Sequence, residues 1–130
     1  MSAQTVLARG RVAAMALMVD ACIIKHPTGL ATDPTTGVVT PTYSTIYTGA
    51  CKVQRGMDAS AQEVAEAHRA VLRPFVHVPI TVTGVVEGDV VTITASVNDA
   101  ELVGRVFRVM GPDHKSFATA RRLQCTEATS

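Results

Sequence analysis

Four histidines are the side chains in this sequence best suited to acid–base chemistry or metal binding near neutral pH. No two of them have the spacing of a typical metal site; they are His26, His68, His77 and His114. The carboxylates fall in predicted turns or at helix caps, where their local role is to accept hydrogen bonds from backbone N–H groups. They are Asp58, Glu63, Glu66, Asp89, Asp99 and Glu101. We therefore predict that these residues are structural and that the chain has no metal site.

Two other kinds of chemistry also lack a local signature. Nucleophilic catalysis needs a base beside the nucleophile and a third group that orients the base, and no motif of that kind occurs in the sequence. Gly84, Gly88 and Gly104 are not followed by a helix with Lys and Ser or Thr, which a phosphate-binding loop requires. The sequence thus predicts a protein that is not an enzyme and that holds no cofactor.

Cys22, Cys51 and Cys125 are odd in number, widely spaced and without a C-x-x-C pair. This pattern favours buried free thiols in a reducing compartment over a disulfide or a metal site.

Composition narrows the class of protein further. The 130 residues fit a single domain. Twelve Lys and Arg face eleven Asp and Glu, a net charge of +1, which lacks the basic excess of proteins that bind by neutralising phosphates. Aromatic residues make up only 4% of a chain that is 47% hydrophobic, so few side chains can stack on bases or sugars. Free-standing nucleic-acid binding is therefore disfavoured.

The N-terminal residues 1–20 are predicted to form a helix. Good helix formers run from Ala3 to about Val19, Ser2 can act as N-cap, and Gly10 is the weak point. The second half, from Val12 onward, is apolar on almost every side, and its surplus apolar face is expected to meet another chain. The alternative is that alanine tolerates water and that only Met15, Leu17 and Met18 are buried. The predicted packing or interface residues are Leu7, Val12, Met15, Leu17 and Met18.

The same segment superficially resembles a secretion signal, because Arg9 and Arg11 precede an apolar run. The run has only eight residues, and Asp20 lies where a small residue is wanted. It is also shorter than the roughly 20 residues needed to cross a bilayer. We interpret it as a helix of the mature protein and expect no membrane association.

Residues 21–126 are predicted to be strand-rich. Early β-like runs cover residues 22–25, 38–47 and 51–54, with Gly49 as a turn. Residues 27–41 between them form a predicted loop or long hairpin tip, because five prolines and glycines should prevent a continuous ladder. This loop is expected to be mobile in the free subunit and ordered against neighbours, although a plain exposed hairpin tip is the alternative. Its candidate functional residues are Thr28, Gly29, Leu30, Thr32, Asp33, Pro34, Thr35, Thr36 and Gly37.

The second half predicts further strands at residues 80–86, 90–94, 105–110 and 116–125. A helical turn is predicted within Asn98–Gly104, with Asp99 as its cap and Gly104 in the left-handed exit. Residues 60–73 carry conflicting signals, and we predict a helical turn near 60–67 followed by a strand from about 69. Residues 127–130 should fray. The predicted fold is mainly β, a small antiparallel barrel or sandwich with an N-terminal helix and a long early loop.

Three blocks of sequence together resemble a known family of proteins. The first is the helix Arg9-Gly-Arg-Val-Ala-Ala-Met-Ala-Leu-Met-Val-Asp20 leading into Cys22-Ile-Ile24. The second combines Thr32–Tyr43 with Tyr47-Thr-Gly-Ala-Cys-Lys-Val-Gln54, and the third combines residues 79–96, 99–109 and 115–125. In this order they resemble the head-closure, or head-to-tail stopper, proteins of siphophages infecting actinobacteria. The Ala- and Glu-rich residues 55–70 depart from that pattern.

The resemblance implies a structural protein of the virion neck, present in the host cytoplasm during assembly. Such proteins form a ring, here expected to be six-fold rather than twelve-fold, beneath the portal and its adaptor ring. They retain the packaged DNA without sequence specificity and offer a docking surface to the tail terminator or tail tube. The loop at 27–41 would then converge on the ring axis or contact neighbouring subunits.

Two alternatives stay open. Another neck component, an adaptor or a tail terminator, would have the same size and strand content. A nucleic-acid-binding barrel of the OB type would need an aromatic platform, for which the candidates are Tyr43, Tyr47, Phe75 and Phe107.

Overall fold

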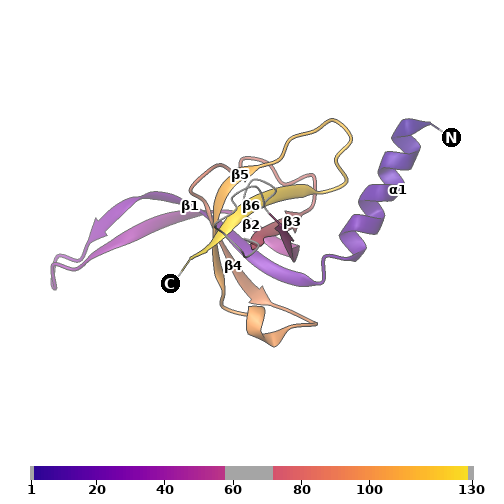
Figure 1. Cartoon of the computed structure of the whole chain (residues 1–130). Helices are drawn as coiled ribbons and strands as arrows, with labels where there is room; N and C mark the ends of the chain where they lie inside the picture. The colour runs from indigo at the N-terminus through magenta and orange to yellow at the C-terminus, as the bar shows by residue number, and fades with distance from the viewer. Residues whose placement is uncertain (1, 58–71, 129–130) are drawn as a thin grey trace, which may run out of the picture.

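The computed structural model describes residues 2–57 and 72–128. Six antiparallel strands close into a barrel in the order β1-β2-β3-β6-β5-β4, and β4 pairs back onto β1 (Figure 1). The elements are α1 Ala3–Ala16, β1 Asp20–Thr32, β2 Val39–Met57, β3 Leu72–Val78, β4 Val90–Ala95, the 3₁₀ turn η1 Ala100–Leu102, β5 Val106–Pro112 and β6 Arg121–Ala128. The prediction of a mainly β fold, a small antiparallel barrel with an N-terminal helix, is confirmed.

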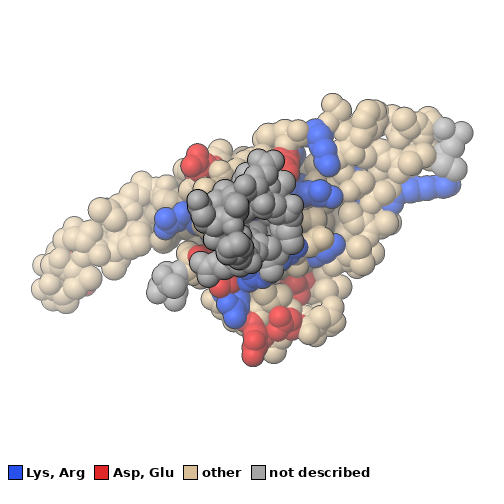
Figure 2. All heavy atoms as spheres, viewed as in Figure 1, with Lys and Arg blue, Asp and Glu red and all other residues tan. Residues whose placement is uncertain are grey.

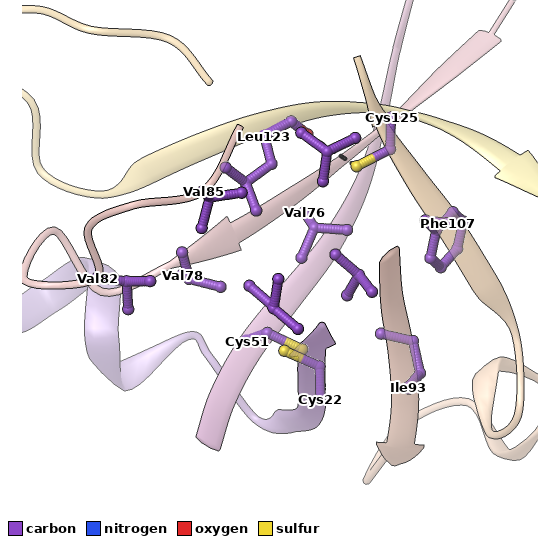
Figure 3. Packing of buried hydrophobic residues seen from close by; sticks show 13 residues of the cluster. Cys22, Cys51, Val76, Val78, Val82, Val85, Ile93, Phe107, Leu123 and Cys125 are labelled. Atoms are coloured by element: carbon purple, nitrogen blue, oxygen red, sulfur yellow. Dashed lines mark hydrogen bonds between the residues drawn. The ribbon is translucent and has the colours of Figure 1, made fainter. Parts of the chain in front are cut away.

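The barrel core forms because alternate residues of each strand point inward. In β5, Phe107 and Val109 are fully buried while Arg108 between them is exposed, and in β6 Leu123 and Cys125 alternate in the same way (Figure 3). Burying one such large side chain contributes about 1.5–3 kcal/mol. The core is therefore built from aliphatic residues, cysteines and a single phenylalanine, as the composition of the chain suggests.

The long early segment is a two-stranded arm rather than a loop. β1 and β2 pair continuously from Asp20 opposite Cys51 to Thr32 opposite Val39. β4 accompanies β1 only as far as Lys25, so beyond that point the two strands project from the barrel (Figure 1). We define the arm as residues 27–43 and its tip as residues 33–38.

The prediction that prolines and glycines would prevent a ladder in residues 27–41 is thus wrong outside the tip, because the segment is a long paired hairpin. The ladder tolerates Pro27 and Pro41 because each arm strand has one partner only, which leaves half of its N–H positions facing solvent. A register shift between Pro27 and Gly29 absorbs the remaining mismatch, and Gly29 there adopts a positive φ of 148°. Gly49, predicted as a turn, lies inside β2, and the Tyr47 side chain occupies the space beside it.

Residues 80–86, predicted as a strand, form an irregular connection between β3 and β4. Its apolar residues Val82 and Val85 still point into the core. Two of its carbonyl groups accept from a side chain instead of a neighbouring strand, because Arg121 donates from Nη2 to the Ile80 oxygen and from Nε to the Val82 oxygen, both at 3.3 Å. Period-two alternation therefore predicted the burial of Val82 but not that of Val85, since Val86, which is in phase with Val82, is 45% exposed, and the predicted strand pairing is wrong.

Several element ends differ from the predictions. The helix ends at Ala16 rather than Val19, although its Ser2 cap is confirmed by the hydrogen bond from Thr5 N–H. β5 continues through Pro112, and β6 begins at Arg121 rather than Ser116. The 3₁₀ turn with its Asp99 cap and the left-handed Gly104 are confirmed.

The C-terminal residues 127 and 128 belong to β6 instead of fraying, since Glu127 forms ion pairs with Arg55 and Arg105. The predicted helical turn at 60–67 and the start of the strand at 69 lie outside the described residues, as do residues 129 and 130.

Candidate functional site

The predicted loop residues all lie together at the outer part of the arm. Thr28, Gly29, Leu30 and Thr32 belong to β1, and residues 33–37 form most of the tip. Every residue from 27 to 41 is exposed, so the arm contributes nothing to the barrel core. A hydrogen bond of 2.8 Å between the Thr28 and Thr42 hydroxyl groups ties the two strands together. The arm therefore offers free strand edges, hydroxyl groups and a few apolar side chains to a partner.

The tip has a defined conformation. Asp33 N–H donates to the Val38 oxygen and Gly37 N–H donates to the Asp33 oxygen, both at 2.8 Å. The Asp33 carboxylate also accepts from Thr35 N–H at 2.8 Å and from Thr36 N–H at 3.4 Å. These backbone hydrogen bonds, from Thr35 above all, lower the pKa of Asp33. Asp33 is thus a fixed negative charge, and it is the only charged residue between Lys25 and Lys52.

The predicted helix residues divide into two groups. Leu7 and Met18 are buried against the rest of the chain, with 8% and 6% of their surface exposed. Val12, Met15 and Leu17 are at least half exposed. The alternative in which Met15 and Leu17 are also buried within the subunit is therefore wrong, and an exposed apolar helix surface remains.

A groove next to this helix was missed by the sequence analysis. It has a volume of about 480 Å³ and is lined by Ala3, Val6, Leu7, Gly10, Phe117 and Thr119. Arg11 Nε donates to the Ala118 oxygen at 3.2 Å and holds the helix to this loop. The overlooked signal is Gly10, because a glycine inside a helix often marks close packing. A Cβ placed on Gly10 would lie 2.9 Å from Thr119 Cγ2.

His26 is in β1 at the base of the arm and contacts a buried carboxylate. Its Nδ1 is 2.5 Å from Oδ1 of Asp89, which is fully buried. The other carboxylate oxygen accepts from Val86 N–H at 2.9 Å. Asp89 therefore satisfies a backbone N–H, as predicted for this turn, and also ties β1 to the segment before β4. No hydroxyl or thiol among the described residues is hydrogen-bonded to the His26 ring, so this pair lacks a nucleophile.

His77 lies on the outer face of β3 in a cationic setting. It is paired across the strands with Lys52 and Arg122, and together with Gln54, Phe75 and Arg122 it lines a cavity of about 160 Å³. Burial first, then the charges of Lys52 and Arg122, lower the pKa of His77 to about 4. A neutral imidazole between two cations is unsuited to a proton-transfer role near pH 7.

The other histidines are separate from these two. His114 lies in the loop before β6, where Arg121 Nη1 is 3.2 Å from its Nδ1, and His68 is outside the described residues. Within residues 2–57 and 72–128, no group of three His, Cys, Asp or Glu side chains could hold a metal ion.

All three cysteines are free and fully buried in the barrel, as predicted (Figure 3). A hydrogen bond with Cys22, followed by burial, raises the pKa of Cys51. Burial raises the pKa of Cys125 to about 12. The Cys51 and Cys125 thiols therefore stay protonated at neutral pH and are poor nucleophiles.

The four aromatic residues of the proposed OB-type platform do not share a surface. Phe107 points into the core, whereas Phe75 lines the outer cavity on β3. Tyr47 packs against the core and donates from its hydroxyl to the Ala50 oxygen at 2.8 Å, while Tyr43 is on the arm. Stacking of successive bases on these side chains has no structural basis.

The geometry defines a class of protein: a small closed antiparallel barrel with an N-terminal helix and a long hairpin arm. The chain belongs to a family of unknown function (DUF6093), whose model matches residues 10–126. That range covers the arm and all of the barrel strands except the last two residues of β6, and it omits the first part of α1.

A solved structure shares this fold. The solution structure of protein SF1141 from Shigella flexneri 2a is similar with a TM-score of 0.54 at 17% identity, over 83% of this chain and 90% of that chain. No curated protein matches the sequence. No described helix combines the length and apolar character needed to cross a membrane.

Proposed function

We propose that this chain is a structural protein of the phage virion neck, a ring-forming head-to-tail stopper that closes the portal channel after DNA packaging and docks the tail. The observation that carries this proposal is the arm. It extends away from a complete barrel, it is exposed throughout, and it holds a single charge, Asp33 (Figure 1). A segment of this kind gains its stabilisation from other subunits, because an isolated two-stranded ribbon is at best marginally stable in water.

The electrostatics of the arm suit a channel that DNA must leave. Between Lys25 and Lys52 the chain has no Lys or Arg, and Figure 2 shows none on the outer arm. Basic residues in the channel would bind phosphates strongly and would slow ejection. An arm of threonine and small apolar residues can contact packaged DNA or neighbouring arms without holding the genome electrostatically.

The described chemistry supports a structural role over an enzymatic one. Among the described residues, the pair formed by the buried Asp89 carboxylate and the exposed His26 ring lacks a nucleophile, and the raised pKa values of Cys51 and Cys125 keep those two thiols protonated inside the barrel. The proposed partners follow from the sequence resemblance: further copies of the chain in a ring, six-fold in preference to twelve-fold, an adaptor on the portal side, and a tail terminator or tail tube.

The test is to remove the arm while the barrel stays intact. Residues 28–42 are replaced by Asn-Gly, which joins the paired Pro27 and Tyr43 through a two-residue hairpin turn. Because the removed residues bury nothing, the circular dichroism spectrum and melting temperature should stay close to those of the wild type. We expect DNA-filled heads that leak or fail to join tails.

A Gly-Ser segment of the same length as residues 28–42 is the matched control, since it keeps the reach of the arm but not its strands or side chains. It should fail like the shortened variant. Normal yields of infectious particles from either variant would contradict the proposal. A symmetry-resolved image of the neck distinguishes a stopper from an adaptor or terminator by the position of the ring. Steeply salt-dependent DNA binding by the purified chain would instead favour the OB-type alternative.

A further inference from the structure

Two exposed apolar surfaces lie at opposite ends of the molecule. One is the outer arm, and the other is the groove between α1 and residues 117–119; the barrel separates them (Figure 1). Leu30 on the arm is 74% exposed, and Phe117 at the groove is 60% exposed. Surfaces at opposite ends cannot cover each other within one chain, but they can do so between two copies.

The arm has one apolar face. Residues directly opposite in an antiparallel pair point to the same side, and sides alternate along each strand. The register places Leu30 opposite Pro41 and Thr32 opposite Val39, so these four residues share a face. The other face carries Ala31 and Thr40. The hydrogen bonds of Asp33 hold the tip in one conformation, which lowers the cost of ordering the arm on a partner.

The groove is suited to receive such a face. Its volume of about 480 Å³ lies within the range of about 300–1,000 Å³ typical of pockets that bury most of a ligand. Val6, Leu7 and Phe117 give it an apolar lining. The contact of Gly10 with Thr119 and the hydrogen bond of Arg11 to Ala118 fix the helix beside the loop, so the groove exists before binding.

Charge indicates which surfaces meet. α1 contains Arg9 and Arg11 and no carboxylate, whereas the arm has Asp33 as its only charge. Figure 2 shows basic side chains at the helix end of the molecule and none on the outer arm. Contact between two arms would bring two carboxylates together, and contact between two helices would bring four guanidinium groups together. Contact between an arm and a helix places opposite charges side by side.

We propose that the arm of one copy docks through its Leu30, Val39 and Pro41 face into the α1 groove of the next copy. This contact is head-to-tail, so repetition gives a ring if the rotation closes and a filament if it does not. The inference rests on the proposed ring-forming function and names the subunit contact that builds the ring.

The test is cross-linking of full-length chains with a short bismaleimide. T32C places a thiol on the docking face of the arm, and A3C places one in the groove, while Leu30 and Val6 are retained. The native thiols are buried and should not react. Mixed at about 1 mM, a concentration that populates even millimolar contacts, the two variants should give a covalent heterodimer. The T32C/A3C double variant should give a ladder of multimers.

Two matched pairs serve as controls. T40C lies on the opposite face of the arm, and V97C lies on an exposed loop that does not line the groove. The yield of cross-linked heterodimer from T32C with A3C should be at least about fivefold higher than the yield from either control pair. The control pairs are T40C with A3C and T32C with V97C. L30S and F117S alter exposed side chains, so each should lower the yield without unfolding the chain.

Equal yields in the three pairs would overturn the inference. A predominance of T32C-to-T32C products would also overturn the inference, because the arms would then contact each other. That result would still be compatible with a ring whose arms converge, so the proposed function would stand. Conversely, the expected ladder together with normal virions from the arm-shortened variant would refute the neck function and support the contact.

Discussion

At the scale of single residues, the buried carboxylate of Asp89 and the three thiols occupy structural positions in the barrel. Asp89 is buried with each oxygen occupied, one by the His26 ring and the other by Val86 N–H. The three cysteines fill core positions as small hydrophobic residues. The sequence analysis predicted these roles from spacing alone. It could not predict that His26 and Asp89 meet, because 63 residues separate them and the contact depends on barrel closure.

His77 provides a prediction about acid stability. Its pKa is about 4 in the folded chain, against about 6.5 when unfolded, so the unfolded state binds more protons between these values. The free energy of unfolding should therefore fall as the pH drops from about 6.5 to about 4. Because His77 is half exposed, solvent screening limits its share to roughly 1 kcal/mol.

H77Q should remove the contribution of His77 to the acid-induced loss of stability. In urea titrations, the free energy of unfolding of the variant should therefore fall less than that of the wild type between pH 7 and pH 4.5. K52Q should raise the pKa of His77 only in part, because burial is the larger cause. An NMR titration of the folded chain that places His77 near 6.5 would contradict the explanation.

At the scale of elements, the helix and the arm differ in how far the sequence predicted them. The Ser2 cap, the helix and the Asp99 turn depend on local hydrogen bonds, which the sequence encodes directly. The arm was only partly predicted, since prolines are tolerated in strands with one partner, and pairing is not a local property. Residues 80–86 alternate like a strand, but Arg121 takes the place of a neighbouring strand.

The end of α1 allows a comparison between two adjacent apolar residues. Met18 is 6% exposed and Leu17 is 59% exposed. M18D would bury an unpaired carboxylate, so it should lower the free energy of unfolding by several kcal/mol. L17D should change it by less than about 0.5 kcal/mol. Thermal melts of the two purified variants measure the difference, and equal losses would show that the helix does not pack as described.

Gly10 allows a test of helix docking. Alanine in place of glycine in an exposed helix normally stabilises by about 1 kcal/mol, but here the new Cβ would lie 2.9 Å from Thr119 Cγ2. G10A should therefore gain little or lose stability. T119S removes that methyl group, so G10A in the T119S background should recover the full gain. Urea unfolding of the four proteins in this double-mutant cycle gives the coupling, and strictly additive effects would mean that the helix and loop do not touch.

At the scale of the whole molecule, the barrel closes within one chain, whereas the arm and α1 leave large apolar side chains exposed. The core closes around thirteen buried residues without help from either projection. The composition and strand spacing predicted the barrel because burial of alternate residues is a property of the chain itself. The groove beside α1 could not be predicted, since it depends on where the loop at residues 117–119 comes to lie.

The final prediction concerns assembly of the isolated chain. Stable interfaces bury about 1,200–2,000 Å² in total, but the exposed apolar residues of the arm and groove are few and separate. We therefore expect a monomer of 13.7 kDa by light scattering at about 10 μM, a concentration too low to populate a millimolar contact. Addition of the adaptor-bearing head should convert it into a ring, because the neighbouring ring raises the local concentration of docked subunits. Weak self-association of the isolated chain suits a stopper, since a ring that closed alone could block the portal before the genome has entered. A stable closed ring of purified protein at micromolar concentration would contradict this account.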